Sequence, residues 1–461
     1  MKEDGDNMTK VLLNINLKNL KDPNIIKKNV KKIATILSEI DEKNEKDKYL
    51  CLSCIFGAFL GDSMGSICEF SSPSKDNHKG IFAYKNGIFA PGEVTDDSEM
   101  AMSAAFAYID AINEDPSIIQ DLLYYYFCLW RCTGPKDMGH ATQSALRFWN
   151  CQSIQDTEFN YKMVSQYNWD SLANGFLMRI STFIVFYYYT HLDNIEKVIQ
   201  NYVSKENNEI TKELKDLYYD IYHESSKNTE ITHPNYENGI SSAVFTLMTL
   251  TGMVTNDPNK VYNLFLKIVS SKNFFDEHQK NKREIYSARI VQEKYAAIIK
   301  EVESDKITPV ISMMGYYIHG FKLSVYFVKQ LIDIKIDENT YYKIMCDVCD
   351  FGGDTDTNCA IVGAMIGPLI GYKNFKKEYF DEFINFIPEE RCQFNSAFMY
   401  IYVKYLEEKL LKKEGNQEQS KKDENTSIQN PSSSFKGSDN KKVNFKYTAY
   451  KKILEFLNQE I

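Results

Sequence analysis

The chain has 461 residues, 43% hydrophobic and 25% charged, which is ample for the buried core of one large domain or two smaller ones. Its formal net charge of −9 argues against general binding to nucleic-acid phosphates. The net charge does not exclude a local basic groove. Lys10, Lys18 and Lys21 interrupt the N-terminal apolar stretches, and no run approaches the roughly 18 apolar residues of a membrane span. We therefore expect a soluble monomer of the cytoplasm, with the nucleus as the alternative, and no nucleic-acid or membrane partner.

The first predicted element is a helical extension over residues 1–46, in which Pro23 favours a helix start and branched apolar residues recur on one face. From residue 47 to residue 411, apolar residues recur at i, i+3 and i+4, while strict alternation is nearly absent. The most apolar stretch, 180–189, is too short to span a membrane and is predicted to be a buried helix. These patterns indicate an all-α fold with a single large helical domain over residues 47–411.

Polar composition sets several segments apart from this domain. Residues 412–446 are rich in Lys, Glu, Gln, Asn and Ser and cannot bury enough apolar area to order themselves, so a disordered linker is predicted there. A short amphipathic C-terminal helix is predicted over residues 447–461. Residues 200–230 and 270–305 are charged helical stretches, which we interpret as solvated insertions.

The cysteines raise one question about metal binding. Two CxxC pairs, Cys51/Cys54 and Cys346/Cys349, would supply a four-cysteine zinc site, but both pairs sit in apolar helical patterns. Because Cys is among the most buried residue types, buried thiols are the favoured interpretation.

The first motif with chemical content is GAFLGDSMGSICEF, from Gly57 to Phe70. Glycines four residues apart on a helix let another backbone approach closely. Asp62 and Glu69 are harder to explain by packing, because an acidic residue in an apolar helix must be paired, ligated, protonated or used to brace a neighbouring loop. Two helical turns separate them, so we expect both on roughly one face.

The second motif is Thr95-Asp96-Asp97-Ser98. One interpretation is a helix start, with Asp97 or Ser98 as the N-cap of the helix that continues through residue 111. A cap does not need adjacent carboxylates, which repel each other unless a cation lies between them. The motif therefore indicates a metal site as well as a helix start.

The third motif is GGDTDTN, over residues 352–358. Its glycines permit positive φ and a sharp turn before a helix. Asp354 and Asp356, two residues apart on a turn, can reach one cation, with the Thr357 hydroxyl as a third oxygen. Hard oxygen ligands of this kind suit Mg²⁺ or Mn²⁺ rather than zinc. The second and third motifs are far apart in the chain, so only the fold can unite them.

In order and spacing, these motifs resemble those of the ADP-ribosylglycohydrolase family, of the dinitrogenase-reductase-activating type, whose members carry a GDxxGxxxE helix, a TDDT loop and a GGDTDT-N loop. Three further segments are similar to family elements: residues 134–142 to its DIG-x-x-T loop, residues 174–179 to its NG-x-x-MR segment, and residues 232–235 to its TH-P element. The resemblance covers about residues 50–390. Ser98 stands where threonine is usual, which keeps the hydroxyl.

The resemblance implies an all-α fold with two Mg²⁺ ions, or Mn²⁺, at the mouth of a cleft. It implies metal ligands at Thr95, Asp96, Asp97, Asp354, Asp356 and Thr357, a catalytic base at Glu69 or Asp354, and substrate contacts at Asp137, Gly139, His140, Thr142, Asn174, Gly175 and His233. The loop from Asp137 to Thr142 would face the pyrophosphate. For His233 an ordinary hydrogen-bonded histidine is an equally weighted interpretation, and Arg179 is interpreted as a structural ion-pair partner. His140 stands where many members have asparagine.

The activity implied by the resemblance is metal-dependent hydrolysis of the N- or O-glycosidic bond that joins ADP-ribose to a protein side chain. Arginine is slightly favoured over serine as that side chain. One alternative is hydrolysis of a free ADP-ribose derivative, such as O-acetyl-ADP-ribose. Another is a non-catalytic, ADP-ribose-binding member of the family, against which the intact metal carboxylates argue. The sequence leaves a protein substrate and a small-molecule substrate as open alternatives.

Overall fold

The computed structural model describes residues 23–82, 88–113, 116–147, 157–205, 209–271, 274–275, 282–388 and 391–411. Apart from two isolated bridges, between Ser71 and Gly353 and between Ala173 and Tyr316, these residues form helices and loops and no strand. The predicted all-α fold is therefore confirmed. Residues 1–22 of the predicted extension, the predicted linker over 412–446 and the predicted helix over 447–461 lie outside the described residues.

Helices make up most of the described residues. In chain order they are α2 (Pro23–Glu39), α3 (Lys46–Gly65), α4 (Asp96–Asn113), α5 (Ile119–Cys132), α6 (His140–Leu146), α7 (Thr157–Tyr167), α8 (Ile180–Thr190), α9 (Leu192–Val203), α10 (Lys212–Thr229), α11 (Tyr236–Thr255), α12 (Pro258–Ser270), α13 (Lys282–Glu303), α14 (Tyr317–Leu331), α15 (Thr340–Phe351), α16 (Thr355–Ile370), α17 (Lys377–Asn385) and α18 (Met399–Leu406).

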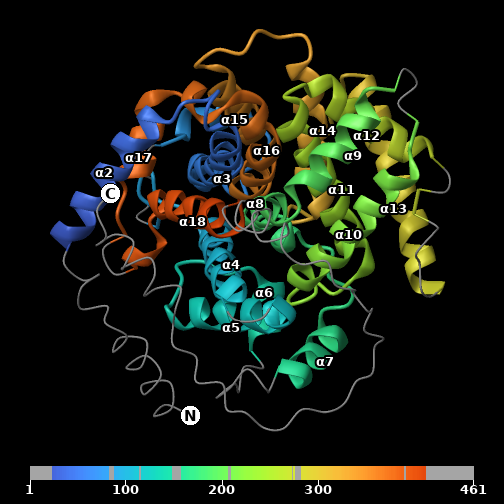
Figure 1. Ribbon diagram of the computed structural model, residues 1–461, viewed down its shortest axis with the longest axis horizontal. Helices are drawn as coiled ribbons and strands as arrows, with labels where there is room; N and C mark the ends of the chain where they lie inside the picture. The colour runs from blue at the N-terminus through green and yellow to red at the C-terminus, as the bar shows by residue number, and fades with distance from the viewer. Residues whose placement is uncertain are drawn as a thin grey trace, which may run out of the picture.

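Helices α3 and α16 lie side by side at the centre of the molecule, with α2 and α17 on one side and α9 to α14 on the other (Figure 1). Glycines permit their close approach: a Cβ at Gly57 would lie 2.3 Å from the carbonyl oxygen of Gly363, and one at Gly65 would lie 2.4 Å from that of Thr355. The end of α3 is thereby pressed against the start of α16. This junction is where the acidic motifs meet.

Two helices are apolar on every side because they are buried on every side. The stretch Lys46–Cys68, which contains α3, has the length and mean hydropathy (1.5) of a membrane span, but 89% of that window is buried inside the protein. It is thus the core helix of a globular fold. Every residue from Ile180 to Tyr189 in α8 is also buried, as predicted for that stretch.

Helix α2, the described part of the N-terminal extension, packs on the rest of the protein through its apolar face. In α2, Val30, Ile33 and Leu37 are each at most 1% exposed, so its apolar face is fully covered. The Tyr372 hydroxyl donates to the Leu37 carbonyl (2.7 Å) and the Lys373 ammonium donates to the carbonyl that follows α2, at residue 40 (2.6 Å). These contacts dock α2 against the segment after α16.

The interpretation of residues 200–230 and 270–305 as solvated insertions is wrong for the part of them that the structure describes. Helix α10 buries Leu217 and Tyr218, and α13 buries Tyr295, which stacks on Phe321 of α14 with ring centroids 4.7 Å apart. The charged residues occupy one face of each helix and raise its average polarity, while the opposite face belongs to the core.

The two CxxC pairs are buried thiols. Cys51 and Cys54 lie inside α3, and Cys346 and Cys349 lie inside α15, all of them buried. This agrees with the interpretation favoured from the sequence.

Candidate active site

Asp62 anchors the start of α4. Its fully buried carboxylate accepts hydrogen bonds from the backbone N–H groups of Thr95 (3.1 Å to each oxygen) and Ser98 (3.2 Å), and from the Ser98 hydroxyl (2.5 Å). Helix α4 begins at Asp96, so Asp97 and Ser98 lie in its first turn, and the suggestion that one of them is the N-cap is wrong. A carboxylate from another helix satisfies those N–H groups instead.

A turn at Gly352 and Gly353 delivers the second set of carboxylates. Both glycines have positive φ, 73° and 82°, a conformation that side chains with a Cβ rarely adopt. The Gly353 N–H donates to the Ser71 carbonyl (2.9 Å), which fixes the turn against the segment after α3. Asp354 then occupies the N-cap position of α16, and Asp356 lies in its first turn.

The fold brings five carboxylates together in two overlapping groups. Oxygens of Asp62, Asp97 and Asp356 lie within 4.8 Å of one another, and so do oxygens of Glu69, Asp354 and Asp356. Asp356 belongs to both groups. Oxygens that share one Mg²⁺ at about 2.1 Å lie at most about 4.2 Å apart, so both groups are near the spacing that a divalent cation requires.

Burial raises the pKa of every carboxyl in these groups, and repulsion from other carboxylates of the groups adds to the rise at Glu69, Asp97 and Asp356. Burial raises the pKa of Asp62 to about 6, and burial together with Asp354 raises that of Glu69 to about 8. The pKa values of Asp97 and Asp356 lie well above the usual range, first through burial and then through neighbouring carboxylates. Adjacent cations would reverse these shifts, because they favour the ionised form.

The donor set fits a hard divalent cation. Asp97 Oδ1 is buried and has no hydrogen-bond partner in the described part of the chain, whereas Asp97 Oδ2 accepts from the Thr95 hydroxyl (3.2 Å). An orphaned carboxylate oxygen is costly unless a ligand satisfies it. The Thr357 side chain counteracts part of the rise in the pKa of Asp97 and of Asp354. Asp62 is the weakest ligand of the set, since its oxygens already accept from three groups at the start of α4.

Asp96 faces a different neighbour from the other acids. Its Oδ2 accepts the backbone N–H of Gly139 (3.3 Å), and it belongs to neither of the two carboxylate groups found among the described residues. Asp137 lies on the same loop as Gly139, and its Oδ1 accepts the backbone N–H of Met138 (2.7 Å). Its charge contributes to the raised pKa of Asp96, after burial. The predicted substrate loop therefore adjoins the carboxylate groups through Asp96.

Glu69 does not lie on the helix of Asp62, where the sequence analysis placed it. Helix α3 ends at Gly65, and a 3₁₀ turn over Ser66–Cys68 precedes Glu69, so Asp62 and Glu69 do not share a helix face. Glu69 is half-buried, whereas the other four acids of the two groups are buried. It is thus the carboxylate of these groups that lies nearest to solvent.

Asn174 joins the middle of the chain to the third motif. Its side-chain amide donates to Asp354 Oδ2 (2.8 Å), and its backbone N–H donates to the Gly315 carbonyl (2.9 Å). A Cβ at Gly315 would lie 3.4 Å from Asp354 Oδ2, so this glycine lines the site. Sequence reasoning missed Gly315, whose one signal is a glycine just before the start of α14.

Arg179 holds the turn that carries Asn174. It is fully buried, and its guanidinium donates to the Gly175 carbonyl (2.8 Å), the Asn228 side chain and carbonyl (2.8 and 2.9 Å) and the Thr232 hydroxyl (2.9 Å). These acceptors are neutral, so the interpretation as an ion-pair partner is wrong. Burial lowers the pKa of Arg179 to about 9. Its role is to order a polar turn in the core.

His233 packs on the glycine next to Asn174. Its ring lies 2.9 Å from where a Cβ of Gly175 would be, and the Thr142 hydroxyl lies 3.5 Å from the same point. His233 Nδ1 bonds the Thr232 hydroxyl (2.7 Å), while Nε2 is buried without a partner among the described residues. Burial and then Arg179 lower its pKa to about 3, so the ring is neutral. His140, at the start of α6, is exposed.

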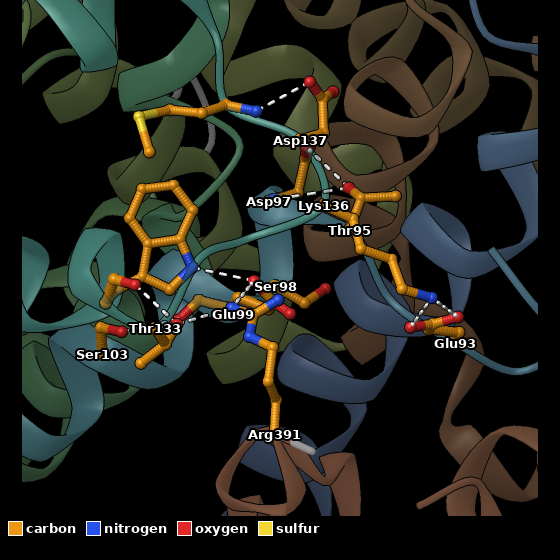
Figure 2. Close-up of polar contacts among 12 residues, drawn as sticks. Glu93, Thr95, Asp97, Ser98, Glu99, Ser103, Thr133, Lys136, Asp137 and Arg391 are labelled. Atoms are coloured by element: carbon orange, nitrogen blue, oxygen red, sulfur yellow. Dashed lines mark hydrogen bonds and ion pairs between the residues drawn. The ribbon is translucent and has the colours of Figure 1, made fainter. Parts of the chain in front are cut away.

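A further polar cluster near the site, around Glu99 and Glu93, was not predicted from the sequence. Glu99, in the first turn of α4, accepts from the Trp130 indole (2.8 Å) and from Arg391 (2.6 Å), and Figure 2 shows Arg391 reaching Glu99 from the segment after α17. Lys136 pairs with Glu93 (2.6 Å) beside the same loop. These ion pairs brace the outer side of the acidic motif, and the ion pairs seen among the described residues include none of the carboxylates of the two groups.

The chain is similar to known proteins of one family. The sequence model of the ADP-ribosylglycohydrolase family matches residues 42–386. A protein of Acanthamoeba polyphaga mimivirus, named provisionally as an ADP-ribosyl glycohydrolase, is 24% identical over 355 residues, which span 74% of this chain and 92% of that protein. A solved structure titled "ADP-ribosylglycohydrolase-related protein complex" superposes with a TM-score of 0.44 at 14% identity, over 74% of this chain and 98% of that one.

The family match extends over well more than half of the chain, so the protein belongs to the ADP-ribosylglycohydrolase family. Membership assigns it to the hydrolases that act on ADP-ribose linkages, and ADP-ribosylated compounds are its class of substrate. The family is typically metal-dependent, which agrees with the acidic groups described above.

Proposed function

We propose that this protein is a Mg²⁺- or Mn²⁺-dependent hydrolase that releases ADP-ribose from a modified protein side chain. The observation that carries the proposal is the pair of three-carboxylate groups that share Asp356. The two groups would hold two divalent cations, with Asp356 as a ligand common to both. Asp97 and Asp354, with the hydroxyls of Thr95 and Thr357, complete the ligand set, and Asp62 braces it.

The bound cations would polarise a water molecule and the ribose hydroxyls. The residues of the chain position the reactants and move the proton. The water oxygen forms a bond to C1″ of the ribose while the C1″–N or C1″–O bond to the side chain breaks, through an oxocarbenium-like transition state. The proton lost by the water passes to a carboxylate and is available to the departing side chain, so the reaction balances as a hydrolysis.

Glu69 is the better of the two candidate bases. Asp354 is buried and its Oδ2 is held by the Asn174 amide, which suits a fixed ligand. Glu69 lies at the solvent side of the same group, and burial and Asp354 hold its pKa at about 8. A carboxylate with a raised pKa accepts a proton more readily than an ordinary one, although nearby cations lower that value again.

We also propose which residues contact the substrate, which side chain carries the ADP-ribose and where the protein is located. Asp137, Gly139, His140, Thr142, Asn174, Gly175 and His233 are proposed to contact the ADP-ribose. Arginine is slightly favoured as the modified side chain, because the 134–142 loop and the 174–179 segment are more similar to the arginine-specific members. A free ADP-ribose derivative is the second candidate, and the cytoplasm is the proposed location.

Incubation with ADP-ribosyl-arginine and ADP-ribosyl-serine peptides, with and without Mg²⁺, tests the proposal. We expect Mg²⁺-dependent release of ADP-ribose from one peptide, faster from the arginine peptide. Release that survives exhaustive chelation would contradict the metal requirement. Turnover of O-acetyl-ADP-ribose with neither peptide cleaved would replace the protein substrate by the free derivative.

A further inference from the structure

The backbone that carries Glu69 is held in place by hydrogen bonds rather than by a helix. Glu69 follows the 3₁₀ turn after α3, and its backbone angles (φ −53°, ψ 135°) lie outside the helical region. The next residue, Phe70, has φ 54°, a left-handed conformation that is costly for a residue with a Cβ. Phe70 is also 60% exposed, so packing of its ring does not impose this conformation. The contacts of the neighbouring backbone therefore determine where Glu69 lies.

The turn before α16 provides the first of these contacts. The Phe70 N–H donates to the Gly353 carbonyl (2.6 Å), and the Gly353 N–H donates back to the Ser71 carbonyl (2.9 Å). A Cβ at Gly352 would lie 2.6 Å from the Ser71 carbonyl oxygen and 2.8 Å from the Pro73 nitrogen. The two backbones thus touch with no side chain between them.

Asn77 and His78 make a second connection, to the end of α15. The Asp350 carboxylate accepts the His78 backbone N–H (3.1 Å) and the His78 ring Nδ1 (3.0 Å), which must be the donor because a carboxylate only accepts. The Asn77 side-chain amide donates to the Cys349 carbonyl (3.0 Å) and to the Ser72 carbonyl (3.0 Å). The segment that begins at Phe70 is thus fastened to the α15–α16 connection at both of its ends.

The contact between His78 and Asp350 is better suited to fixing geometry than to adding stability. The two side chains are 36% and 19% exposed, and polar pairs near the surface add little to stability. Asp350 lies four residues before Asp354, so the contact joins the segment of Glu69 to the turn that delivers the metal-ligating carboxylates. Proton transfer requires heavy atoms about 2.6–3.2 Å apart, so a small displacement of Glu69 would slow it.

We propose that the contact between His78 and Asp350 is a clasp that positions Glu69 beside Asp354 and Asp356. His78 and Asp350 belong to neither of the two carboxylate groups found among the described residues, so they are positioning residues that act through Glu69. The inference rests on the function proposed above, in which Glu69 accepts the proton of the attacking water. Without the clasp, the segment keeps its contacts with Gly353 and loses its side-chain contact with Asp350.

Steady-state kinetics of the full-length protein at saturating Mg²⁺ test the clasp, with the ADP-ribosyl-arginine or ADP-ribosyl-serine peptide that the wild type cleaves. His78→Ala should lower kcat about tenfold and leave KM within twofold, because the proposed substrate contacts are untouched. His78→Asn should restore most of kcat, since its amide nitrogen takes the place of Nδ1 and can donate to Asp350. Lys79→Ala is the matched control: it removes a surface ion pair with Asp76 from the same turn and should keep the wild-type kcat.

A change at Glu69 itself distinguishes positioning from a general structural role. When His78→Ala is added to Glu69→Gln, the residual kcat should fall less than twofold, because no proton acceptor is left to position. A further tenfold loss in that background would show that His78 acts by another route and would overturn the inference. Asp350→Ala should reproduce the loss seen in His78→Ala, and the double variant should lose no more than either single variant.

The outcomes separate the clasp from the proposed function. Wild-type kcat in both His78→Ala and Asp350→Ala would overturn the inference and leave the function standing, and so would an equal loss of kcat in Lys79→Ala. Failure of the wild type to cleave any ADP-ribosyl compound would overturn the function, and the inference with it. Thermal melts show whether each variant is folded; if His78→Ala is not, Asp350→Ala tests the clasp from its other side.

Discussion

Two buried polar regions meet at Asn174, and they are organised in opposite ways. On one side, the carboxylates of Asp97, Asp354 and Asp356 crowd together, repel each other and leave a buried oxygen without a partner among the described residues. On the other side, the Arg179 guanidinium is surrounded by carbonyl, amide and hydroxyl acceptors at 2.8–2.9 Å. Both regions are equally removed from water.

This difference in hydrogen bonding is the one expected between a proposed ligand site, the carboxylate cluster, and a structural site, the surroundings of Arg179. A buried polar network that satisfies itself stabilises the fold and has no need of a ligand. A buried cluster of like charges lowers the stability of the protein until a ligand of opposite charge binds. Such a cluster is therefore typical of a functional site. Asn174 belongs to both regions, since the Arg179 turn positions it and its amide orients Asp354.

The largest expected effect is on activity. Asp356→Ala removes the carboxylate shared by both groups, and we expect kcat to fall about 10³-fold, since metal-ion catalysis is worth several kcal/mol. The fold should survive, and in EDTA the variant should melt at or above the wild-type temperature because one repelling charge is gone. Circular dichroism and turnover with saturating Mg²⁺ measure both effects. Asp381→Ala, at an exposed position of α17, is the control; normal turnover of Asp356→Ala would refute the assignment.

A change at Arg179, on the other side of Asn174, should lower stability whether or not metal is present. Arg179→Met leaves several buried acceptors unsatisfied and should lower the free energy of unfolding by about 3–5 kcal/mol, in Mg²⁺ and in EDTA alike. Denaturant melts measure the loss. Arg289→Met, on the exposed face of α13, should change stability by less than about 0.5 kcal/mol. A stability loss that appears only when Mg²⁺ is present would mean that Arg179 belongs to the metal site instead.

The carboxylate side should also respond to pH. The folded pKa of Asp62 is raised from 3.8 to about 6 and that of Glu69 from 4.5 to about 8. The folded state therefore binds more protons than the unfolded state between about pH 4 and 8, so stability is present at low pH and is lost as pH rises through this window. In EDTA we expect the Tm to fall over that range. Added Mg²⁺ should raise the Tm at pH 8 and remove the fall, and a Tm that rises with pH in EDTA would contradict this account.

The smallest effect is expected at the brace of the acidic motif. Ser98→Ala removes the hydroxyl that donates to Asp62 at 2.5 Å and should cost about 1.5 kcal/mol of stability, as for other hydrogen bonds to charged groups. Ser98→Thr keeps the hydroxyl and should restore most of that loss. Thermal melts of the two variants measure the difference. Equal melting temperatures for Ser98→Ala and Ser98→Thr would show that the Asp62 contact is not needed to hold the motif.

The features that depend on a few adjacent residues were predicted from the sequence. Helical periodicity predicted the all-α fold, and clustered acids and hydroxyls predicted that Asp97, Asp354 and Asp356 are candidate ligands, because each signal is contained in a few adjacent residues. Glycines such as Gly57 predicted that another backbone approaches their helix closely, and the structure identifies that backbone as α16.

What escaped prediction depends on contacts between distant segments. Gly315 lines the site only because the Asn174 turn bonds to its carbonyl, and Arg391 reaches Glu99 from nearly three hundred positions away. The neutral acceptors of Arg179 come from a helix end and a loop that the sequence does not connect. Helix α13 was misjudged for a related reason: its buried face is visible only once its neighbours in the fold are known.

The proposed function requires that the acidic groups hold two divalent cations, with Asp356 as a ligand common to both. Electron paramagnetic resonance of the protein titrated with Mn²⁺ tests it most directly, because two Mn²⁺ ions that share a carboxylate are magnetically coupled. We predict two bound ions per chain with a coupled spectrum in the wild type, and loss of the coupling in Asp356→Ala. A spectrum of free or single, uncoupled Mn²⁺ in the wild type would contradict the claim.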